Sequence, residues 1–267
     1  DLQGITIAYD EFAGTHDDEA PLAATLAAHY GIAHHVRRVT RDEFLSDLPR
    51  ILEALDQPTI DGVNTWYASK AVAERGLKVA ISGVGGDELF HGYTHFRSLP
   101  RLLRARQLAS GVPGMTVLLR SLGSWQSART GNMRWAHLER WTRTIEGAWW
   151  LRRSIFTPEQ LPSLMGADLA REALAEFDVV SEVRAMTGAL PKDPTLALAQ
   201  IESTTYLRNQ LLRDSDWASM DHGVELRTPL VDYRFVETTI GLMKANPTVR
   251  PQPKKWFRDA VRDIVPE

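Results

Sequence analysis

Cysteine is absent from all 267 residues of this chain. This excludes disulfides, thiolate metal sites and a cysteine nucleophile within the sequence, and it agrees with the cytoplasmic location that we expect. The chain also lacks an excess of basic residues, because 31 Lys and Arg face 34 Asp and Glu for a net charge of −3. Charge therefore gives no reason to predict nucleic acid as a partner.

Long hydrophobic runs are missing as well. No run of 18 apolar residues occurs, so no transmembrane span and no membrane partner are predicted. The N-terminus shows no basic segment followed by an apolar one, so no secretory signal is predicted. Apolar residues make up 43% of the chain, which is ordinary for a globular protein, and the length suffices for one large or two smaller domains.

The first part of the chain alternates between strand and helix patterns. Strands are predicted near residues 5–9, 35–39 and 77–81, with amphipathic helices between them. This alternation predicts an α/β fold with a parallel sheet and flanking helices, in which the three strands are adjacent. No G-x-G-x-x-G motif opens a helix after the first strand, which disfavours a dehydrogenase.

From about Pro100 the strand signal fades and the remainder reads as helices broken by Gly and Pro. The strongest of these patterns predicts one helix over Leu196–Arg213. We therefore predict two parts, an α/β nucleotide-binding part at 1–98 and a mostly helical part at 99–267.

A glycine-rich turn follows the third predicted strand and carries the sequence S-G-V-G-G-D-E at residues 82–88. Such a turn lets backbone N–H groups approach an anion without interference from Cβ atoms. An aspartate just past it, here Asp87, can hold Mg²⁺ on phosphate oxygens. The glycines alone are weak evidence, because many strand-to-helix turns contain glycine.

A second string, from Asp216 to Asp232, strengthens the prediction. Together the two strings resemble the synthetase domain of the glutamine-dependent asparagine synthetases, whose patterns read S-G-x-G-x-D-E-x-F-x-G-Y and D-R-x-S-M-x-x-x-x-E-x-R-x-P-F-L-D. The resemblance covers roughly residues 1–266 and is weakest between about 98 and 190. The matching residues are Ser82, Gly83, Gly85, Asp87, Glu88, Phe90, Gly92 and Tyr93 in the first string and Asp216, Ser219, Met220, Glu225, Arg227, Pro229 and Asp232 in the second.

The resemblance implies a fold and a reaction. The fold is that of ATP-pyrophosphatases of the PP-loop type, which is similar to the adenine nucleotide alpha hydrolases. The reaction uses ATP and Mg²⁺ to adenylate a small-molecule carboxylate, aspartate or a sugar carboxylate, which ammonia then converts into an amide, as in asparagine biosynthesis. The family's N-terminal glutaminase, with its cysteine, is not in this sequence, and a homodimer is left open.

The resemblance also assigns site residues. The backbone at Ile7 is expected to line the adenosine pocket, and Asp87 is expected to ligate Mg²⁺ and, with Glu88, to be catalytic. Two of these assignments have a structural alternative: Ile7 is a core residue, and Glu88 could instead hold the loop. Ser82 could cap its own turn. The residues expected to contact the nucleotide are Ser82, Gly83, Gly85 and Gly86.

Two further segments are interpreted less specifically. Residues 56–65 could line the acceptor pocket, or form a turn in which Asn64 or Thr65 caps the next helix. In the second string we predict an ion-pair cluster that fixes a helix-to-loop junction, because buried charges need partners. Its members are Asp216, Glu225, Arg227 and Asp232.

Three departures from the family pattern limit the resemblance. No S-G-G-x-D-S loop occurs, and Val84 stands where the family usually has an acid that handles protons. The family's lysine beyond a segment like 260–266 is missing too, and Lys254 and Lys255 lie too early to replace it. We therefore expect a piece of a longer protein, truncated at both ends and inactive alone. The alternatives are a non-catalytic scaffold or amidation of a carboxylate other than aspartate.

Overall fold

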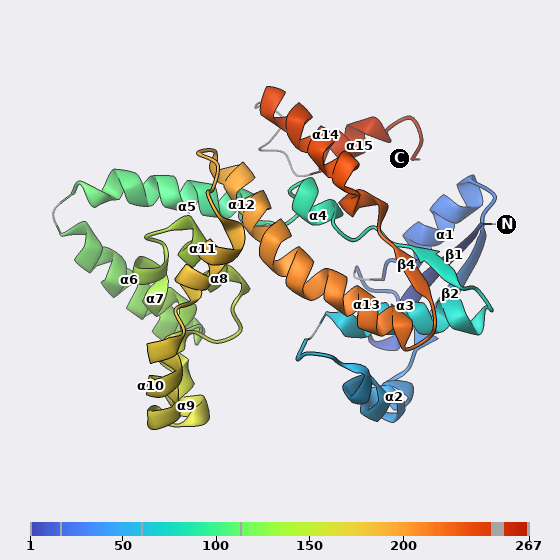
Figure 1. Ribbon diagram of the computed structural model, residues 1–267, viewed down its shortest axis with the longest axis horizontal. Coiled ribbons are helices and arrows are strands. Elements are labelled where there is room, and N and C mark those ends of the chain that lie inside the picture. The colour runs from blue at the N-terminus through green and yellow to red at the C-terminus, as the bar shows by residue number, and fades with distance from the viewer. Residues whose placement is uncertain (1, 17, 60, 113, 247–253, 266–267) are drawn as a thin grey trace. The chain divides into compact units, whose positions relative to one another are not determined.

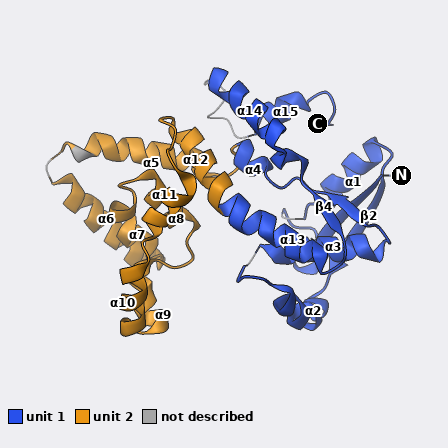
Figure 2. Ribbon diagram, in the orientation of Figure 1, with its two compact units in different colours: residues 1–90, 206–245, 254–267 blue, residues 91–205, 246–253 orange. Residues whose placement is uncertain are grey.

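The structure is a computed structural model, and it describes residues 2–16, 18–59, 61–112, 114–246 and 254–265. The chain divides into two compact units (Figure 2). Unit 1 comprises residues 1–90, 206–245 and 254–267, and unit 2 comprises 91–205 and 246–253. The two parts predicted from the sequence follow chain order, whereas unit 1 combines three separate segments.

Unit 1 contains two pairs of parallel strands (Figure 1). Strand β1 (Gln3–Tyr9) pairs with β2 (Ala33–Val39), with Gln3 opposite Ala33 and Tyr9 opposite Val39. Strand β3 (Val79–Ile81) pairs with β4 (Glu225–Arg227). The predicted strands and their parallel pairing are confirmed for the first two.

The predicted adjacency of all three N-terminal strands is wrong for the described residues, because β3 pairs with β4 and not with β1 or β2. The ladder between β3 and β4 is extended at both ends: the Glu225 N–H donates to the Lys78 carbonyl, and the Ser82 N–H donates to the Arg227 carbonyl, each at 2.8 Å. Strand β4 has only three residues and a charge at each end. It therefore carries no β-rich pattern that would predict it.

The helices of unit 1 surround one main core. Helix α3 packs against β1 and α13, and the core beneath it consists of Val39, Ile51, Trp66, Tyr67, Trp217 and Ala218. Helix α2 begins after Thr40, whose side chain accepts the Glu43 N–H at the helix N-terminus. The helices are α1 (Ala20–His29), α2 (Arg41–Ala54), α3 (Gly62–Glu74), α4 (Gly86–Leu89), α13 (Leu212–Met220), α14 (Tyr233–Ala245) and α15 (Lys255–Ala260).

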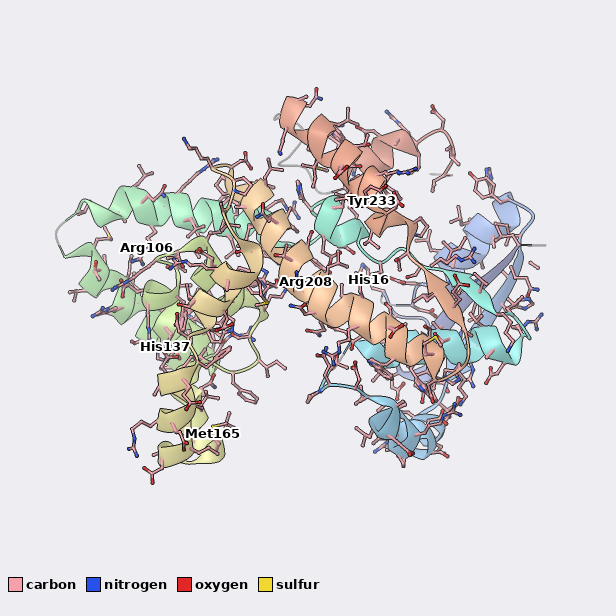
Figure 3. All side chains as sticks on the ribbon, viewed as in Figure 1. His16, Arg106, His137, Met165, Arg208 and Tyr233 are labelled. Carbon is pink, nitrogen blue, oxygen red and sulfur yellow. The ribbon has the colours of Figure 1, made fainter. Side chains whose placement is uncertain are left out.

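The regular structure in the described residues of unit 2 consists of helices, and the one strand described after Pro100, the three-residue β4, belongs to unit 1, in agreement with the predicted loss of strand signal. The buried carboxylates of unit 2 are held by arginines: Glu139, for example, accepts from Arg106 of α5, labelled in Figure 3, at 3.1 Å and from Arg120 at 3.0 Å. The helices are α5 (His95–Ser110), α6 (Met115–Thr130), α7 (Arg134–Trp141), α8 (Ile145–Arg153), α9 (Leu161–Met165), α10 (Ala167–Glu176), α11 (Val179–Thr187) and α12 (Pro194–Glu202).

The single helix predicted over Leu196–Arg213 is helical along its length but not uniform. Helix α12 is followed by a π-helical segment, Ser203–Leu211, and then by α13. Stretches of π-helix are rare and are frequent at functional sites. None of the helices in the described part of the chain has the length and apolar character needed to cross a membrane.

Candidate functional site

The glycine-rich turn lies between β3 and α4 in unit 1. Ser82 and Gly83 have no regular structure, Val84 and Gly85 form the turn, and α4 begins at Gly86. The Ser82 hydroxyl accepts the Val84 N–H at 3.3 Å. Ser82 therefore stabilises its own turn, which is one of the two roles that the sequence left open for it.

The glycines of this turn differ in what requires them. Gly85 has a left-handed φ of 93°, and a Cβ there would lie 2.3 Å from Cγ1 of Val231. At Gly86 a Cβ would lie 3.1 Å from Cδ1 of Leu230. At Gly83 a Cβ would meet nothing within 4 Å, and φ is not left-handed. Packing therefore explains Gly85 and Gly86, whereas at Gly83 the backbone is open to close approach from outside.

The two acids that follow the turn have different surroundings. The Asp87 side chain is 40% exposed, and its Oδ1 lies 2.7 Å from Nζ of Lys254. Glu88 is only 1% exposed. Of the pair, Asp87 is thus the one whose carboxylate is accessible to a solute. The ammonium group of Lys254 is its neighbour.

Lys254 lies too early in the chain to match the family's lysine, but its ammonium group contacts Asp87. The Lys254 N–H donates to the Phe90 carbonyl at 2.7 Å, and Trp256 packs against the small core of Leu89, Phe90 and Met243. Contact between segments so far apart in the chain leaves no local pattern. Trp256, two residues after Lys254, was the available sign that this segment packs against the rest of the protein.

Ile7 lies in the other strand pair. It is partly buried against the main core and sits opposite Arg37 of β2. Two residues later, the Tyr9 hydroxyl donates to Oδ1 of Asn64 at 2.5 Å. This bond fixes the carboxyl end of β1 to the first turn of α3, and parallel sheets bind ligands at the carboxyl ends of their strands.

Residues 56–59 and 61, ahead of α3, are hydrogen-bonded to the π-helical segment and to α13. Asp61 precedes α3, but its side chain does not cap the helix. Its carboxylate instead accepts from the Tyr206 hydroxyl at 2.7 Å and from Nε2 of Gln210 at 2.5 Å. Helix α3 begins at Gly62, so the predicted caps at Asn64 or Thr65 are wrong. The remaining bonds join Asp56 to Arg213, Gln57 to the Asn209 carbonyl, and Thr59 to Asp214.

Asp214 is the most buried acid near this segment, at 2% exposure. Burial raises its pKa above the usual range. Hydrogen bonds from Thr59 and Trp217 oppose the rise, while the charges of Asp61 and Asp56 add to it. Each carboxylate here has a donor within the protein. The cluster is therefore structural, and it holds the segment ahead of α3 in place.

The predicted ion-pair cluster in the second string is wrong. Among the described residues Arg227 pairs only with Glu225, at 2.9 Å, and both side chains are about 60% exposed. Oδ1 of Asp232 accepts the N–H groups of Arg234 and Phe235 and so caps α14. Asp216 is exposed. The string therefore supplies the edge strand β4 and a helix cap.

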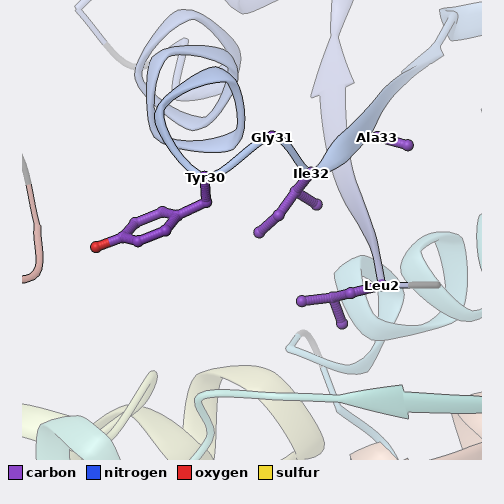
Figure 4. Close-up of a pocket in the computed structure, with 5 residues that line it drawn as sticks. All are labelled: Leu2, Tyr30, Gly31, Ile32 and Ala33. Atoms are coloured by element: carbon purple, nitrogen blue, oxygen red, sulfur yellow. The ribbon is translucent and has the colours of Figure 1, made fainter.

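A hollow of about 510 Å³ lies at the amino ends of β1 and β2, away from their carboxyl ends at Tyr9 and Val39 (Figure 4). Leu2 precedes β1, and Tyr30, Gly31, Ile32 and Ala33 lead into β2. These residues lie at the amino ends of the strands and carry no charged group. The hollow is thus separate in position and in chemistry from the turn at residues 82–88.

The donor groups of the described residues do not form a metal site by themselves. In the described ranges no three His, Asp or Glu side chains gather in a way that could hold a metal ion. Mg²⁺ is often bound by one or two carboxylates together with phosphate oxygens and water. Asp87 therefore suits a cation that arrives with a phosphate ligand, rather than one held by the protein alone.

Comparison with known proteins agrees with the motifs. The family model described as asparagine synthase matches residues 1–267. A putative asparagine synthetase [glutamine-hydrolyzing] of Mycobacterium tuberculosis is 30% identical over 251 residues, which are 93% of this chain and 37% of that protein. Asparagine synthetase [glutamine-hydrolyzing] 1 of Bacillus subtilis is 25% identical over 259 residues, 93% of this chain and 38% of that protein. The chain thus spans little more than a third of these relatives.

Proposed function

Because the chain belongs to the asparagine synthase family, we propose that it carries the ATP-dependent step of amide formation. An oxygen of the acceptor carboxylate attacks the α-phosphorus of ATP, and pyrophosphate leaves. Ammonia attacks the acyl carbon of the resulting acyl-adenylate, loses a proton and displaces AMP, so that the amide remains. The family match supports the overall reaction, and the turn at residues 82–88 supports its location.

The open backbone at Gly83 carries this proposal. Neither packing nor a left-handed φ requires a glycine at this position, and its place between the end of β3 and Asp87 leaves the backbone open to a ligand. We place the nucleotide there, against Ser82 and Gly83 and beyond the carboxyl end of β3. The Ile7 backbone on β1 is proposed to line the adenosine side, as the resemblance implies.

Asp87 is proposed as the metal ligand of this site. When bound, Mg²⁺ would neutralise charge that develops on the leaving pyrophosphate. Glu88, at 1% exposure, is placed behind Asp87, where it holds the turn. Gly85 and Gly86 allow the close packing of the turn on Val231 and Leu230, and they bring the turn's N–H groups near the nucleotide.

The acceptor is proposed to be aspartate or a sugar carboxylate, with ammonia from a glutaminase domain. Val84 occupies the middle of the turn and cannot accept a proton as ammonia attacks. This favours an acceptor other than aspartate. The competing proposal is a non-catalytic module that keeps the fold and binds a partner.

Gly83→Ala in the full-length protein tests the proposal. The new methyl group meets nothing in the protein, so the melting temperature should stay unchanged. ATP binding and carboxylate-dependent ATP–pyrophosphate exchange should fall roughly tenfold or more, because a preorganised contact to the nucleotide is lost. Gly111→Ala is the matched control, since Gly111 is equally open and has φ −80°.

The two proposals predict different results. If Gly83→Ala retained full ATP–pyrophosphate exchange, the nucleotide would not bind against this turn. Absence of both ATP binding and exchange in the wild-type protein, assayed with aspartate and with uronic acids, would favour the non-catalytic module.

A further inference from the structure

We propose that helices α5 and α6 of unit 2 bind the surface of an anionic membrane. Apolar side chains of α6 enter the headgroup region, and arginines of both helices bind the lipid phosphates. The inference goes beyond the proposed function and does not depend on it. The two helices contact each other within unit 2 (Figure 2). The exposed residues that carry the proposal, called the α5–α6 surface below, are Arg97, Arg101, Arg104 and Leu108 of α5 and Leu118, Leu122, Trp125 and Arg129 of α6.

Helix α6 buries small side chains and exposes large apolar ones. Its two buried residues are a glycine and a serine, and a Cβ at Gly123 would lie 2.4 Å from the carbonyl oxygen of Trp135 in α7. Leu118, Leu122 and Trp125 follow one another at intervals of four and three residues, so they share one face, and they are 50%, 52% and 58% exposed. A helix of a globular protein usually turns such a stripe toward its core. Here the stripe is available to a partner.

The charge around this stripe has one sign. Residues 91–138 contain seven arginines and no aspartate, glutamate or lysine, although the whole chain has a net charge of −3. On α5, Arg97, Arg101 and Arg104 are exposed at helical spacing, and none of them forms an ion pair with a described residue. On α6, the guanidinium carbon of Arg129 lies 5.5 Å from the centre of the Trp125 ring. The segment therefore complements an anionic surface.

A membrane supplies both properties that this surface complements. Helices that lie in the membrane interface place Leu and Trp at the boundary between headgroups and acyl chains, and keep basic residues among the headgroups. A guanidinium can donate two parallel N–H groups to phosphate oxygens. Charge of a single sign along two helices suits an extended surface that carries the opposite sign throughout, which a leaflet with anionic lipids provides.

Contact of this kind needs no membrane-spanning helix. The prediction of no membrane partner rested on the lack of an apolar run long enough to cross a bilayer. A helix that lies on the surface of a membrane needs only one apolar face. We therefore restrict that prediction to spanning segments.

Helix α10 of the same unit shows the contrast. Leu169 is 54% exposed, about as much as Leu122, but it lies between Asp168 and Glu172 in the sequence. The nearby Arg171 pairs with Asp168 at 2.6 Å. An exposed leucine is therefore not unusual by itself. The α5–α6 surface differs because its apolar residues are accompanied by arginines and by no acid.

The experiment measures sedimentation of the full-length protein with vesicles of phosphatidylcholine, alone or mixed with an equal part of phosphatidylglycerol. The wild type should bind the mixed vesicles and not phosphatidylcholine alone, and salt should weaken binding. Leu122→Ser should weaken it about tenfold, because less apolar surface is buried. Arg101→Gln should weaken it about fivefold, the effect of one basic residue near an anionic surface.

Leu169→Ser and Arg171→Gln in α10 are the matched controls, and both should bind as the wild type does. All four substituted side chains are exposed, so the melting temperatures should stay close to that of the wild type. Leu122→Ser should also keep the wild-type rate of ATP–pyrophosphate exchange in solution. Failure of the proposed function would appear in that exchange assay, and failure of the present inference would appear in vesicle binding.

Three results would overturn the inference. The first is a wild-type protein that does not bind the mixed vesicles. The second is equal binding by Leu122→Ser and Leu169→Ser, which would reduce the contact to attraction between charges. The third is a wild-type dimer that binds no vesicles and that Leu122→Ser converts into a monomer, which would assign the stripe to contact between two copies of the chain.

Discussion

Glu202 is a fully buried carboxylate of unit 2, and two side chains, Arg153 and His95, lie against it. Arg153 donates from Nε at 3.1 Å and from Nη2 at 2.9 Å, and Nε2 of His95 lies 2.5 Å from Oε1. The Arg153 guanidinium also lies 4.4 Å from the centre of the Tyr93 ring. A buried ion pair of this kind adds little net stability, but loss of one partner leaves an uncompensated charge.

Arg153→Met should therefore destabilise unit 2 strongly. The expected loss in the free energy of unfolding is about 3–5 kcal/mol, the range for a broken buried pair. Arg152→Met is the matched control, because Arg152 is exposed and its removal should change stability by less than about 0.5 kcal/mol. Chemical denaturation of both variants measures the difference, and equal losses would contradict the prediction.

For single residues, the sequence predicts roles that depend on neighbours in the chain, such as a place in a turn. It does not predict contacts with residues that are distant in the chain. The turn between β3 and α4 follows from glycines and an acid placed after a strand, and the structure has that turn at Gly83–Gly86. Asp232 was assigned to an ion pair, although an aspartate ahead of a helix is a common cap. Lys254 lies too early in the chain to match the family's lysine, and its contact with Asp87 joins segments that are distant in the sequence, so no local pattern predicts it.

Helix α3 depends on one glycine at its start. A Cβ at Gly62 would lie 2.3 Å from Cζ2 of Trp217 and 3.3 Å from Cβ of Asp214. Trp217 is a core side chain, 7% exposed, and its Nε1 donates to Oδ1 of Asp214. The helix can thus approach α13 only because residue 62 has no side chain.

Gly62→Ala should force the Trp217 ring to move and lower stability by about 1–3 kcal/mol, the usual cost of overpacking a core. Gly241→Ala is the control within a helix of the same unit. A methyl group at Gly241 in α14 meets nothing within 4 Å, so the better helix propensity of alanine should raise stability by about 0.5–1 kcal/mol. Melting temperatures that shift in the same direction would contradict this account.

Secondary structure in unit 1 was largely predictable, because helix and strand periodicity are local. The pairing of β3 was not, since its partner β4 is short, charged at both ends and distant in the chain. The π-helical segment was missed for a related reason. Tyr206 and Gln210 both bind Asp61, a tertiary contact that no helix propensity records.

Across the whole molecule, ionisable groups held in unusual states set the response to pH. In unit 1 hydrogen bonds from Arg37 are the main cause that lowers the pKa of Glu43 to about 2. In unit 2 burial opposes ionisation of Glu139, but hydrogen bonds from Arg120, Arg106 and Arg143 prevail and lower its pKa to about 2. Burial lowers the pKa of His222 in unit 1.

These shifts predict a loss of stability in two steps as pH falls. Unfolded His222 takes up a proton near its ordinary pKa of about 6.5, whereas the folded form resists protonation, so stability declines first below that pH. Glu43 and Glu139 stabilise the folded state above their ordinary pKa of 4.5. That contribution is lost as the pH falls from there to about 2. The raised pKa of Asp214 acts in the opposite direction and offsets a part of the second step.

Melting temperatures between pH 8 and pH 2.5 measure both steps, in the wild type and in two variants. His222→Asn should make the first step smaller, because the difference in protonation of this side chain between the folded and unfolded states is removed. Glu139→Gln should lower stability at pH 7, since the arginine cluster loses its anion, and should make the second step shallower. A wild-type melting temperature that rises as pH falls from 7 to 5 would contradict the assignment to His222. An unchanged second step in Glu139→Gln would show that other carboxylates control acid unfolding.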